Sequence, residues 1–248
     1  MFDFDAPEGC LKGKKIMVTG AAAGIGRAAA ITFAKYGATV LLHGRNEESL
    51  NPVYDEIEAL GLELPAICPL DLEFAQPEQY EELAALIEQE FGTIDGLLNN
   101  ASLLGVRSPI QSYDPSLWMK VMQVNVNATF MLTQALLPLM DKDTPSSIVF
   151  TSSSVGRKGR AHWGAYAASK FATEGLMETL ADELPGISKI RVNSINPGAT
   201  RTQMRAWAYP GEVPTNNPAP DEIMNAYLYL MSDSSLEINS QKIDAQTK

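Results

Sequence analysis

The feature that most constrains the fold is an alternation of short apolar runs with longer segments of helical periodicity along the whole chain. Continuous apolar strands separated by helices form parallel sheets that are covered on both faces. Right-handed crossovers then produce a doubly wound α/β fold in which ligands bind at the carboxyl ends of the strands. The expected strands lie at 14–20, 38–44, 65–72, 96–101, 146–153 and 190–198, with a seventh at 241–246. The expected helices lie at 24–37, 47–61, 77–92, 114–141 and 164–184.

One segment interrupts this alternation. Residues 199–220 contain four prolines around Trp207 and Tyr209. An irregular loop of this length more often closes over a substrate than serves as spare chain. We therefore predict a single domain over residues 1–248 with a substrate loop at 199–220. Trp207 and Tyr209 either stack on an apolar substrate or pack the loop down against the protein.

The composition excludes several classes of function. The 248 residues are 45% hydrophobic and 20% charged, which is typical of a globular protein. A net charge of −11 argues against nucleic-acid binding, which needs clustered Lys and Arg. Two cysteines, Cys10 and Cys68, and two histidines predict neither a disulfide framework nor a metal site.

The amino-terminal sequence also bears on location. MFDFDAPEGC is acidic and lacks the basic-then-apolar order of a signal peptide. No apolar run approaches the ~18–20 residues that span a bilayer, so no membrane partner is expected. The predicted location is the cytoplasm.

A glycine-rich turn, TGAAAGIG at 19–26, stands where the first strand becomes the first helix. Its glycines, Gly20, Gly24 and Gly26, have a G-x3-G-x-G spacing. Residues without side chains let the backbone approach a pyrophosphate, and the helix N-terminus presents free N–H groups to it. The position of the turn after the first strand of a βαβ pattern predicts a nucleotide-binding domain of the Rossmann type.

A second motif, GAYAASK at 164–170, places Tyr166 and Lys170 four residues apart. In a helix these two side chains share a face. A free tyrosine has a pKa of about 10, too high for a base near neutral pH, and a cation on the same face stabilises the phenolate. Taken alone, the pair is more typical of an exposed contact on an ordinary amphipathic helix.

Several motifs together resemble the short-chain dehydrogenase/reductase family in order and spacing: TGAAAGIG, NNA at 99–101, Asn125, the set Ser153, Tyr166 and Lys170, and NPG at 196–198. The segment FTSSSVGRKGRAHWGAYAASKF is most similar to the YciK-type bacterial oxidoreductases. The resemblance implies that Tyr166 exchanges a proton with substrate oxygen while hydride moves to or from nicotinamide. Lys170 would lower the pKa of the phenol and hydrogen-bond the nicotinamide ribose.

The resemblance also implies a role for Ser153, which ends the fifth expected strand. Its hydroxyl would donate a hydrogen bond to the substrate carbonyl as negative charge develops there. Ser152 and Ser154 are adjacent rivals, although alternation along a strand turns them to the other face.

Asn125 would interrupt the helix expected at 114–141 and hold a water that relays protons through Lys170. The alternative is a buried amide that satisfies a backbone group. Asn127 is the weaker candidate because Asn125 fits the family pattern better.

The remaining cofactor contacts implied by the resemblance follow successive strands. Asp71 would contact adenine, or it would cap the next helix. Asn99 and Ala101 would line the adenosine ribose and support the central strand. The full expected set is Gly20, Ala22, Gly24, Ile25, Gly26, Arg45, Asn46, Asp71, Leu72, Asn99, Ala101, Tyr166, Lys170, Pro197, Gly198, Thr200 and Thr202.

The end of the second strand, HGRN, predicts which nicotinamide is used. An enzyme that selects NAD usually has an acid there to bind the ribose 2′-OH, whereas this chain has Arg45. Glu47 and Glu48 are better explained as acids in the first turn of a helix. A guanidinium suits a 2′-phosphate, so NADP(H) is preferred over NAD(H). The alternative is a solvated surface arginine.

The sequence therefore favours an NADP(H)-dependent oxidoreductase acting on a small-molecule alcohol or carbonyl compound. Ser153, Trp207 and Tyr209 are the expected substrate contacts. The alternative is a catalytically silent nucleotide-sensing or scaffold protein, which would not need a Ser–Tyr–Lys set. An epimerase or dehydratase is a third interpretation. The chain is short for the extra substrate domain that such an enzyme would need.

The resemblance also implies a homodimer or homotetramer, with 114–141 and the helix of Tyr166 at the interface. Apolar residues there either form a two-fold interface or pack on the sheet: Leu132, Leu136, Phe171 and Leu176. The ending IDAQTK replaces the glycine-rich end usual in the family and leaves the contacts of the C-terminus open.

Overall fold

A seven-stranded parallel sheet forms the centre of the computed structural model, which describes residues 1–140 and 143–246. The strands lie in the order β3-β2-β1-β4-β5-β6-β7, so the direction of winding reverses between β1 and β4. Their bounds are β1 Lys15–Thr19, β2 Thr39–Gly44, β3 Ala66–Pro69, β4 Gly96–Asn99, β5 Ser146–Thr151, β6 Ile190–Asn196 and β7 Lys242–Asp244. The doubly wound parallel fold is confirmed, including the short seventh strand.

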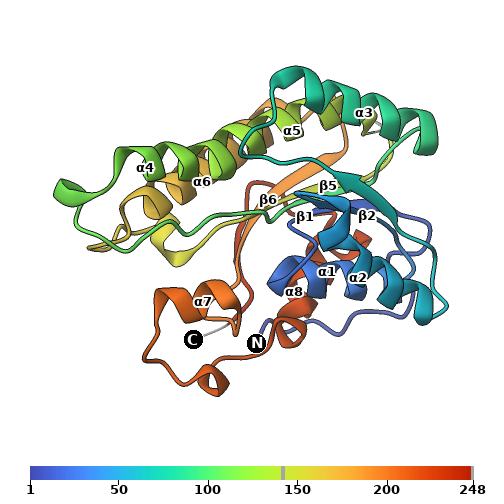
Figure 1. Ribbon diagram of the computed structural model, residues 1–248. Helices are drawn as coiled ribbons and strands as arrows, with labels where there is room; N and C mark the ends of the chain where they lie inside the picture. Colours follow the sequence, from blue (N-terminus) through green and yellow to red (C-terminus); the bar gives the residue numbers. More distant parts are fainter. Residues whose placement is uncertain (141–142, 247–248) are drawn as a thin grey trace.

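Helices cover both faces of the sheet (Figure 1). One layer holds α1 Gly24–Lys35, α2 Glu47–Ala59 and α8 Met224–Met231. The other holds α3 Pro77–Phe91, α4 Pro115–Met122, α5 Ala128–Leu136 and α6 Gly164–Glu183. Each layer has its own apolar core against the sheet, and strand residues such as Val18 and Met17 alternate between the two cores. The short α7, Gln203–Ala208, lies beyond the carboxyl ends of the strands.

Local signals set the helix ends. Asn46 caps α2 by accepting a hydrogen bond from Ser49 N at 3.0 Å, and Glu47 and Glu48 occupy its first turn as expected. Helix α3 begins at Pro77 and ends at Phe91, and the following Gly92 has a φ of 73°, which suits glycine.

Two expected segments differ from the structure. The helix expected at 114–141 is divided into α4, a π-helical turn η2 Gln123–Asn127, α5 and a 3-10 turn η3 Leu137–Leu139. Residue 141 lies outside the described residues. The loop at 199–220 is not wholly irregular, because Thr202 caps α7 by accepting a hydrogen bond from Arg205 N at 3.2 Å. The other short 3-10 turns are η1 Ile110–Ser112, η4 Ser154–Gly156, η5 Pro214–Asn216, η6 Pro220–Ile223 and η7 Asp233–Ser235.

Two of the residues offered for an interface belong to the core instead. Leu132 is 1% exposed and Leu136 is fully buried against the sheet. Leu176 packs on the same core, whereas Phe171 is 47% exposed on the outer side of α6. Helical spacing places these side chains on different faces, and only the inward face can pack against the strands.

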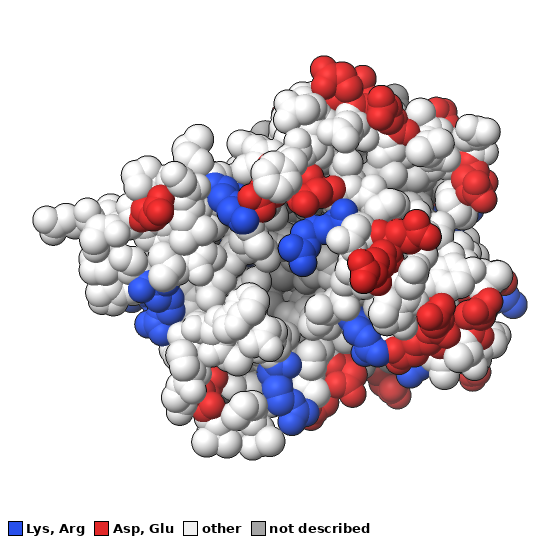
Figure 2. All heavy atoms as spheres, viewed as in Figure 1, with Lys and Arg blue, Asp and Glu red and all other residues white. Residues whose placement is uncertain are grey.

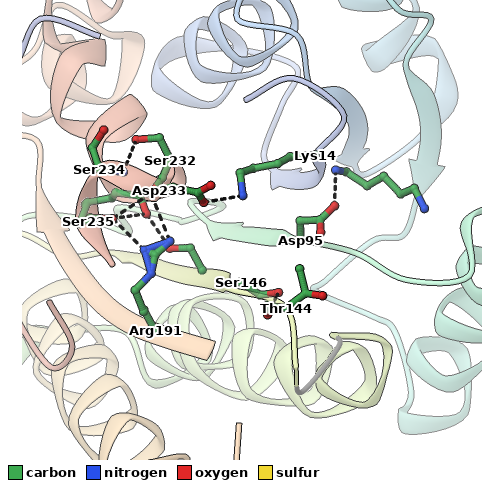
Figure 3. Close-up of polar contacts among 12 residues, drawn as sticks. Lys14, Asp95, Thr144, Ser146, Arg191, Ser232, Asp233, Ser234 and Ser235 are labelled. Atoms are coloured by element: carbon green, nitrogen blue, oxygen red, sulfur yellow. Dashed lines mark hydrogen bonds and ion pairs between the residues drawn. The ribbon is translucent and has the colours of Figure 1, made fainter. Parts of the chain in front are cut away.

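Polar contacts tie together the amino ends of the strands (Figure 3). The buried Arg191 at the start of β6 donates to Ser235 Oγ at 2.8 Å and to Ser232 O at 3.3 Å. Lys14, before β1, pairs with Asp233 at 2.8 Å. These contacts lie at the edge opposite the carboxyl ends of the strands.

Two searches of the described ranges bear on function classes. No helix in them combines the length and apolarity needed to cross a membrane. No group of three or more His, Cys, Asp or Glu side chains in them is placed to hold a metal ion.

Candidate active site

A cavity of about 320 Å³ opens at the carboxyl ends of the central strands, where the winding reverses. In Figure 2 the centre of the molecule is hollowed, and most of the acidic side chains lie in the right-hand half of the view, over α2 and α3. The cavity lies where a doubly wound sheet binds its ligands.

The glycine turn forms one wall of the cavity. Gly20 and Gly24 have φ values of 68° and 57°, which side chains disfavour. A Cβ on Gly26 would lie 2.2 Å from Gly20 O, so only glycine lets α1 start this close to β1. Gly20, Gly24 and Ile25 line the cavity, while Ala22 and Gly26 shape the turn without lining it.

The N-terminus of α1 is open toward this wall. Ala23 stands at the N-cap with no side-chain hydrogen bond, and the first turn holds no acidic residue. The unpaired N–H groups of a helix start attract anions. The glycine turn leaves space that side chains would fill, and the start of α1 has no side-chain cap. Both features fit the pyrophosphate of a dinucleotide.

Asn100 was not predicted, yet it joins the two strands at the switch point. Its Nδ2 donates to Thr19 O at 3.1 Å, and its backbone N donates to Thr19 Oγ1 at 2.8 Å. Asn100 and Ala101 line the cavity. Asn99 does not, because it is buried and donates to Thr133 Oγ1 of α5 at 3.0 Å. Asn99 therefore supports the central strand, as expected, but it does not line the cavity.

Ser153, Tyr166 and Lys170 meet on the opposite wall. The Ser153 hydroxyl, just beyond β5, hydrogen-bonds the Tyr166 phenol. Lys170 Nζ lies 5.6 Å from the centre of the Tyr166 ring and donates to Thr151 O at 2.7 Å. Ser152 also lines the cavity, contrary to the expected alternation, but among the described residues its hydroxyl has no hydrogen-bond partner. Ser154 is exposed and lies outside the cavity.

Burial dominates the electrostatics of this pair. It raises the pKa of Tyr166 to about 12, and the hydrogen bond from Ser153 opposes the rise. Burial also lowers the pKa of Lys170 to about 8, against the charge of Glu174 one turn further along α6. Lys170 is not among the causes of the shift, so the expected lowering of the Tyr166 pKa by Lys170 is not seen in this structure, and the phenol is protonated at neutral pH.

Asn125 lies in the π-helical turn η2 and is 2% exposed. Its Oδ1 accepts from Leu103 N at 2.7 Å, and its Nδ2 donates to Leu103 O at 2.9 Å and to Ser169 Oγ at 3.0 Å. The amide thus satisfies a backbone segment and ties it to the residue beside Lys170. Asn127 is exposed and contacts only Gln123 on its own turn among the described hydrogen bonds.

The adenosine side of the expected site lies further along the same sheet edge. Arg45 follows β2 and is exposed, and Asn46 caps α2. Asp71 accepts from Glu73 N at 3.0 Å, so it does not cap α3, whose cap is Gln76. Leu72 is buried in the core. None of these four residues lines the central cavity.

The loop after β6 closes the end of the cavity where the nicotinamide is expected. Pro197, Gly198, Thr200 and Thr202 all line the cavity. Gln246 holds this loop by donating from Nε2 to Pro197 O at 2.8 Å and Ala199 O at 2.9 Å. The chain end that departs from the family pattern therefore contacts the site, while residues 247–248 lie outside the described residues.

The structure does not place the two substrate contacts expected on the loop at 199–220 at the cavity. Trp207 is 68% exposed, and neither Trp207 nor Tyr209 lines the cavity. Tyr209 packs α7 down, with its ring centre 5.9 Å from that of Trp163. Other apolar residues form this wall and were not predicted: Leu104, Trp163, Met204 and Ala208. Only Trp163 carried a usable signal, because it stands three residues before Tyr166.

Comparisons with known proteins agree with this geometry. The short chain dehydrogenase family model matches residues 14–212. The chain is 54% identical to the uncharacterized oxidoreductase YciK of Escherichia coli K12 over 95% of this chain and 93% of that protein. Two solved short chain dehydrogenases are each 53% identical over 97% of this chain and all of theirs. One is from Shigella flexneri 2a in complex with NADP, with a TM-score of 0.94. The other is from E. coli CFT073 in complex with NADPH, with a TM-score of 0.93.

The family model covers well over half of the chain, and the first of these relatives matches it almost from end to end. The chain therefore belongs to the short-chain dehydrogenase/reductase family of oxidoreductases, which act on alcohol and carbonyl groups with NAD(P).

Proposed function

We propose that this protein is an NADP(H)-dependent oxidoreductase that interconverts a small alcohol and its carbonyl compound at Ser153, Tyr166 and Lys170. The observation that carries the proposal is that these three side chains share one cavity with the glycine turn and the open start of α1. One wall fits a pyrophosphate and the other supplies a proton. A nucleotide-sensing scaffold would need only the first wall.

The preference for NADP(H) rests on Arg45 and on the relatives. Arg45 stands at the end of β2 where an NAD-selective enzyme carries an acid, and its side chain is exposed and free to reach a phosphate. Two relatives of 53% identity were solved with NADP and NADPH.

The proposed chemistry follows from the polar groups on the catalytic wall. A bound nicotinamide would supply or accept the hydride at the substrate carbon. Ser153 donates a hydrogen bond to the substrate oxygen, and Tyr166 Oη gives that oxygen a proton during reduction and takes it back during oxidation. The buried phenol, with its pKa near 12, is the donor form at neutral pH. Lys170 lies beside the ring and stabilises the phenolate that remains after the proton leaves.

The test is the substitution Tyr166→Phe. It keeps the ring and removes only the proton-transferring oxygen, so kcat should fall by about 10²–10⁴-fold. The dissociation constant for NADPH should stay within about twofold of the wild-type value, because the change removes little ground-state binding. Oxidation of NADPH with a panel of aldehydes and ketones gives the first quantity, and fluorescence titration gives the second.

The matched control is Tyr229→Phe, which removes a hydroxyl from a tyrosine that packs on Phe2 and Phe4 outside the cavity. It should leave both quantities unchanged. Near-normal turnover in Tyr166→Phe would contradict the assigned role. A wild-type protein that binds NADPH but turns over no compound in the panel would favour the scaffold interpretation.

A further inference from the structure

The wall beyond the proposed catalytic set is apolar. Leu104, Trp163 and Ala208 are each less than 10% exposed, and Met204 packs against them. These residues come from the segment after β4, the start of α6 and helix α7, so three separate segments present hydrocarbon to the same space. Such a wall favours a substrate that gives up little hydration on entering.

One of the two cations that line the cavity is already paired with a carboxylate. Within the part of the chain that the structure describes, the cavity lining contains two cations, Lys170 and Arg205, and no acid. Arg205 donates from Nε and Nη2 to the two carboxylate oxygens of Glu212, each at 2.6 Å. Asn217 donates to the same carboxylate at 2.9 Å, and the Arg205 guanidinium stacks 3.9 Å from the centre of the Tyr209 ring.

This bidentate pair has a consequence for what can bind. A carboxylate on the far end of a substrate would have to displace Glu212 or enter an apolar space without a counter-charge. Lys170 cannot serve that end, because it is held at Thr151 O beside the reacting oxygen.

On the basis of the proposed function, we infer that the substrate is an apolar and uncharged carbonyl compound, and that Glu212 excludes anionic substrates by occupying Arg205. The Arg205–Glu212 pair would thus determine substrate specificity without contacting the reacting atoms. Removing the charge of Glu212 should free the guanidinium and open the cavity to carboxylates.

The experiment uses a substrate pair that differs only in charge, benzaldehyde and 4-carboxybenzaldehyde, with NADPH. In the wild-type protein, kcat/KM should be at least tenfold higher for benzaldehyde. In Glu212→Gln the ratio should move at least tenfold toward the carboxylated compound. The double variant Glu212→Gln with Arg205→Met should lose that gain, because the cation is gone.

Two controls separate the effect of the Glu212 charge from an effect on the packing of α7. Glu237→Gln removes a charge beyond η7, at the opposite edge of the sheet, and should leave the ratio unchanged. Turnover of benzaldehyde by Glu212→Gln reports whether α7 still packs. The substitution leaves in place Arg107, which holds the end of α7 by donating to Ala208 O at 2.6 Å.

A binding experiment keeps this inference apart from the proposed function. Ligand-observed NMR on the complex with NADP⁺ would compare benzyl alcohol with 4-carboxybenzyl alcohol and needs no turnover. If the wild-type protein binds benzyl alcohol preferentially and Glu212→Gln reverses that preference, the inference is supported whether or not any aldehyde is reduced. Absence of aldehyde reduction would count against the proposed function alone. Equal or tighter binding of the carboxylated alcohol to the wild-type protein, or a ratio unmoved by Glu212→Gln, would overturn it.

Discussion

At the scale of single residues, burial decides the protonation states on which the proposed chemistry depends. It raises the pKa of Tyr166 and lowers that of Lys170, so each group is pushed toward its neutral form. Two neighbours oppose this effect, since Ser153 hydrogen-bonds the phenol and Glu174 faces the ammonium. With pKa values of about 12 and about 8, Tyr166 remains a proton donor and Lys170 remains mostly a cation at pH 7.

Arg45 should set the choice of cofactor. A charge-assisted contact with the 2′-phosphate contributes ~1.5–3 kcal/mol, which is about one to two powers of ten in affinity. Arg45→Ala should therefore raise the dissociation constant for NADPH by that factor and leave NADH unchanged, because NADH has no phosphate there. Lys35→Ala, an exposed cation at the far end of α1, is the control. Equal weakening of both nucleotides would show that Arg45 is a surface residue only.

His43 should make stability depend on pH. It is 1% exposed in β2, both ring nitrogens lack a hydrogen-bond partner among the described residues, and burial lowers its pKa to about 4. Its pKa in the unfolded chain is about 6.5, so the unfolded state binds more protons between these values. Its contribution to stability is present above pH 6.5 and is lost as the pH falls toward 4.

Between pH 7 and pH 5 this group should lower the free energy of unfolding by about 2 kcal/mol. Urea unfolding should show that His43→Leu loses about 2 kcal/mol less unfolding free energy than the wild-type protein between pH 7 and pH 5. His162→Asn, which removes an exposed histidine with a φ of 71°, should behave as wild type. A His43→Leu profile parallel to wild type would refute the assignment.

At the scale of elements, the close approach of η4 to α6 positions the catalytic set. Gly156 is buried, and a Cβ there would lie 2.8 Å from Lys170 Cβ and 2.9 Å from Lys170 C and O. Because Ser153 is the N-cap of η4, a shift of α6 would change the geometry of Ser153, Tyr166 and Lys170 together.

Gly156→Ala should therefore reduce both stability and turnover. Overpacking of this kind costs about 1–3 kcal/mol of unfolding free energy, and kcat should fall at least tenfold. Gly159→Ala is the control on the same segment, because a Cβ there meets nothing within 4 Å. Urea unfolding and NADPH oxidation would measure the two effects. A Gly156→Ala variant that matches Gly159→Ala would show that the approach is not critical.

At the scale of the whole molecule, the sheet places the loops that form the cavity at one edge and the hydrogen bonds of the buried Arg191 at the other. The outer face of the α4–α6 layer leaves two large aromatic side chains exposed, Phe130 at 46% and Phe171 at 47%. A monomer that exposes such side chains on neighbouring helices has a surface suited to pairing.

We predict that the protein is a homodimer or homotetramer whose interface includes Phe130 and Phe171. Light scattering at micromolar concentration should give a mass at least twice that of one 26.9 kDa chain. The double variant Phe130→Glu with Phe171→Glu should shift it toward the monomer, whereas Leu64→Glu, exposed between α2 and β3, should not. A monomeric wild-type protein would refute the prediction.

Much of the fold and part of the site follow from the sequence because they are local. The alternation of apolar and helical segments determines the parallel sheet, and each strand can be recognised from its own residues. The glycine turn and the four-residue spacing of Tyr166 and Lys170 are equally local, since backbone sterics and the helical repeat act over a few residues.

The tertiary structure alone decided which distant side chains meet. It turned Asn99 toward Thr133, buried Leu132 and Leu136, and brought Gln246 to the loop after β6. It also left Trp207 exposed to solvent and paired Arg205 with Glu212. Residue types and spacing leave each of these alternatives open, because the choice depends on which face packs against a neighbour from elsewhere in the chain. The sequence thus determined the family, the sheet and the chemical groups, and packing determined the walls of the cavity that those groups share.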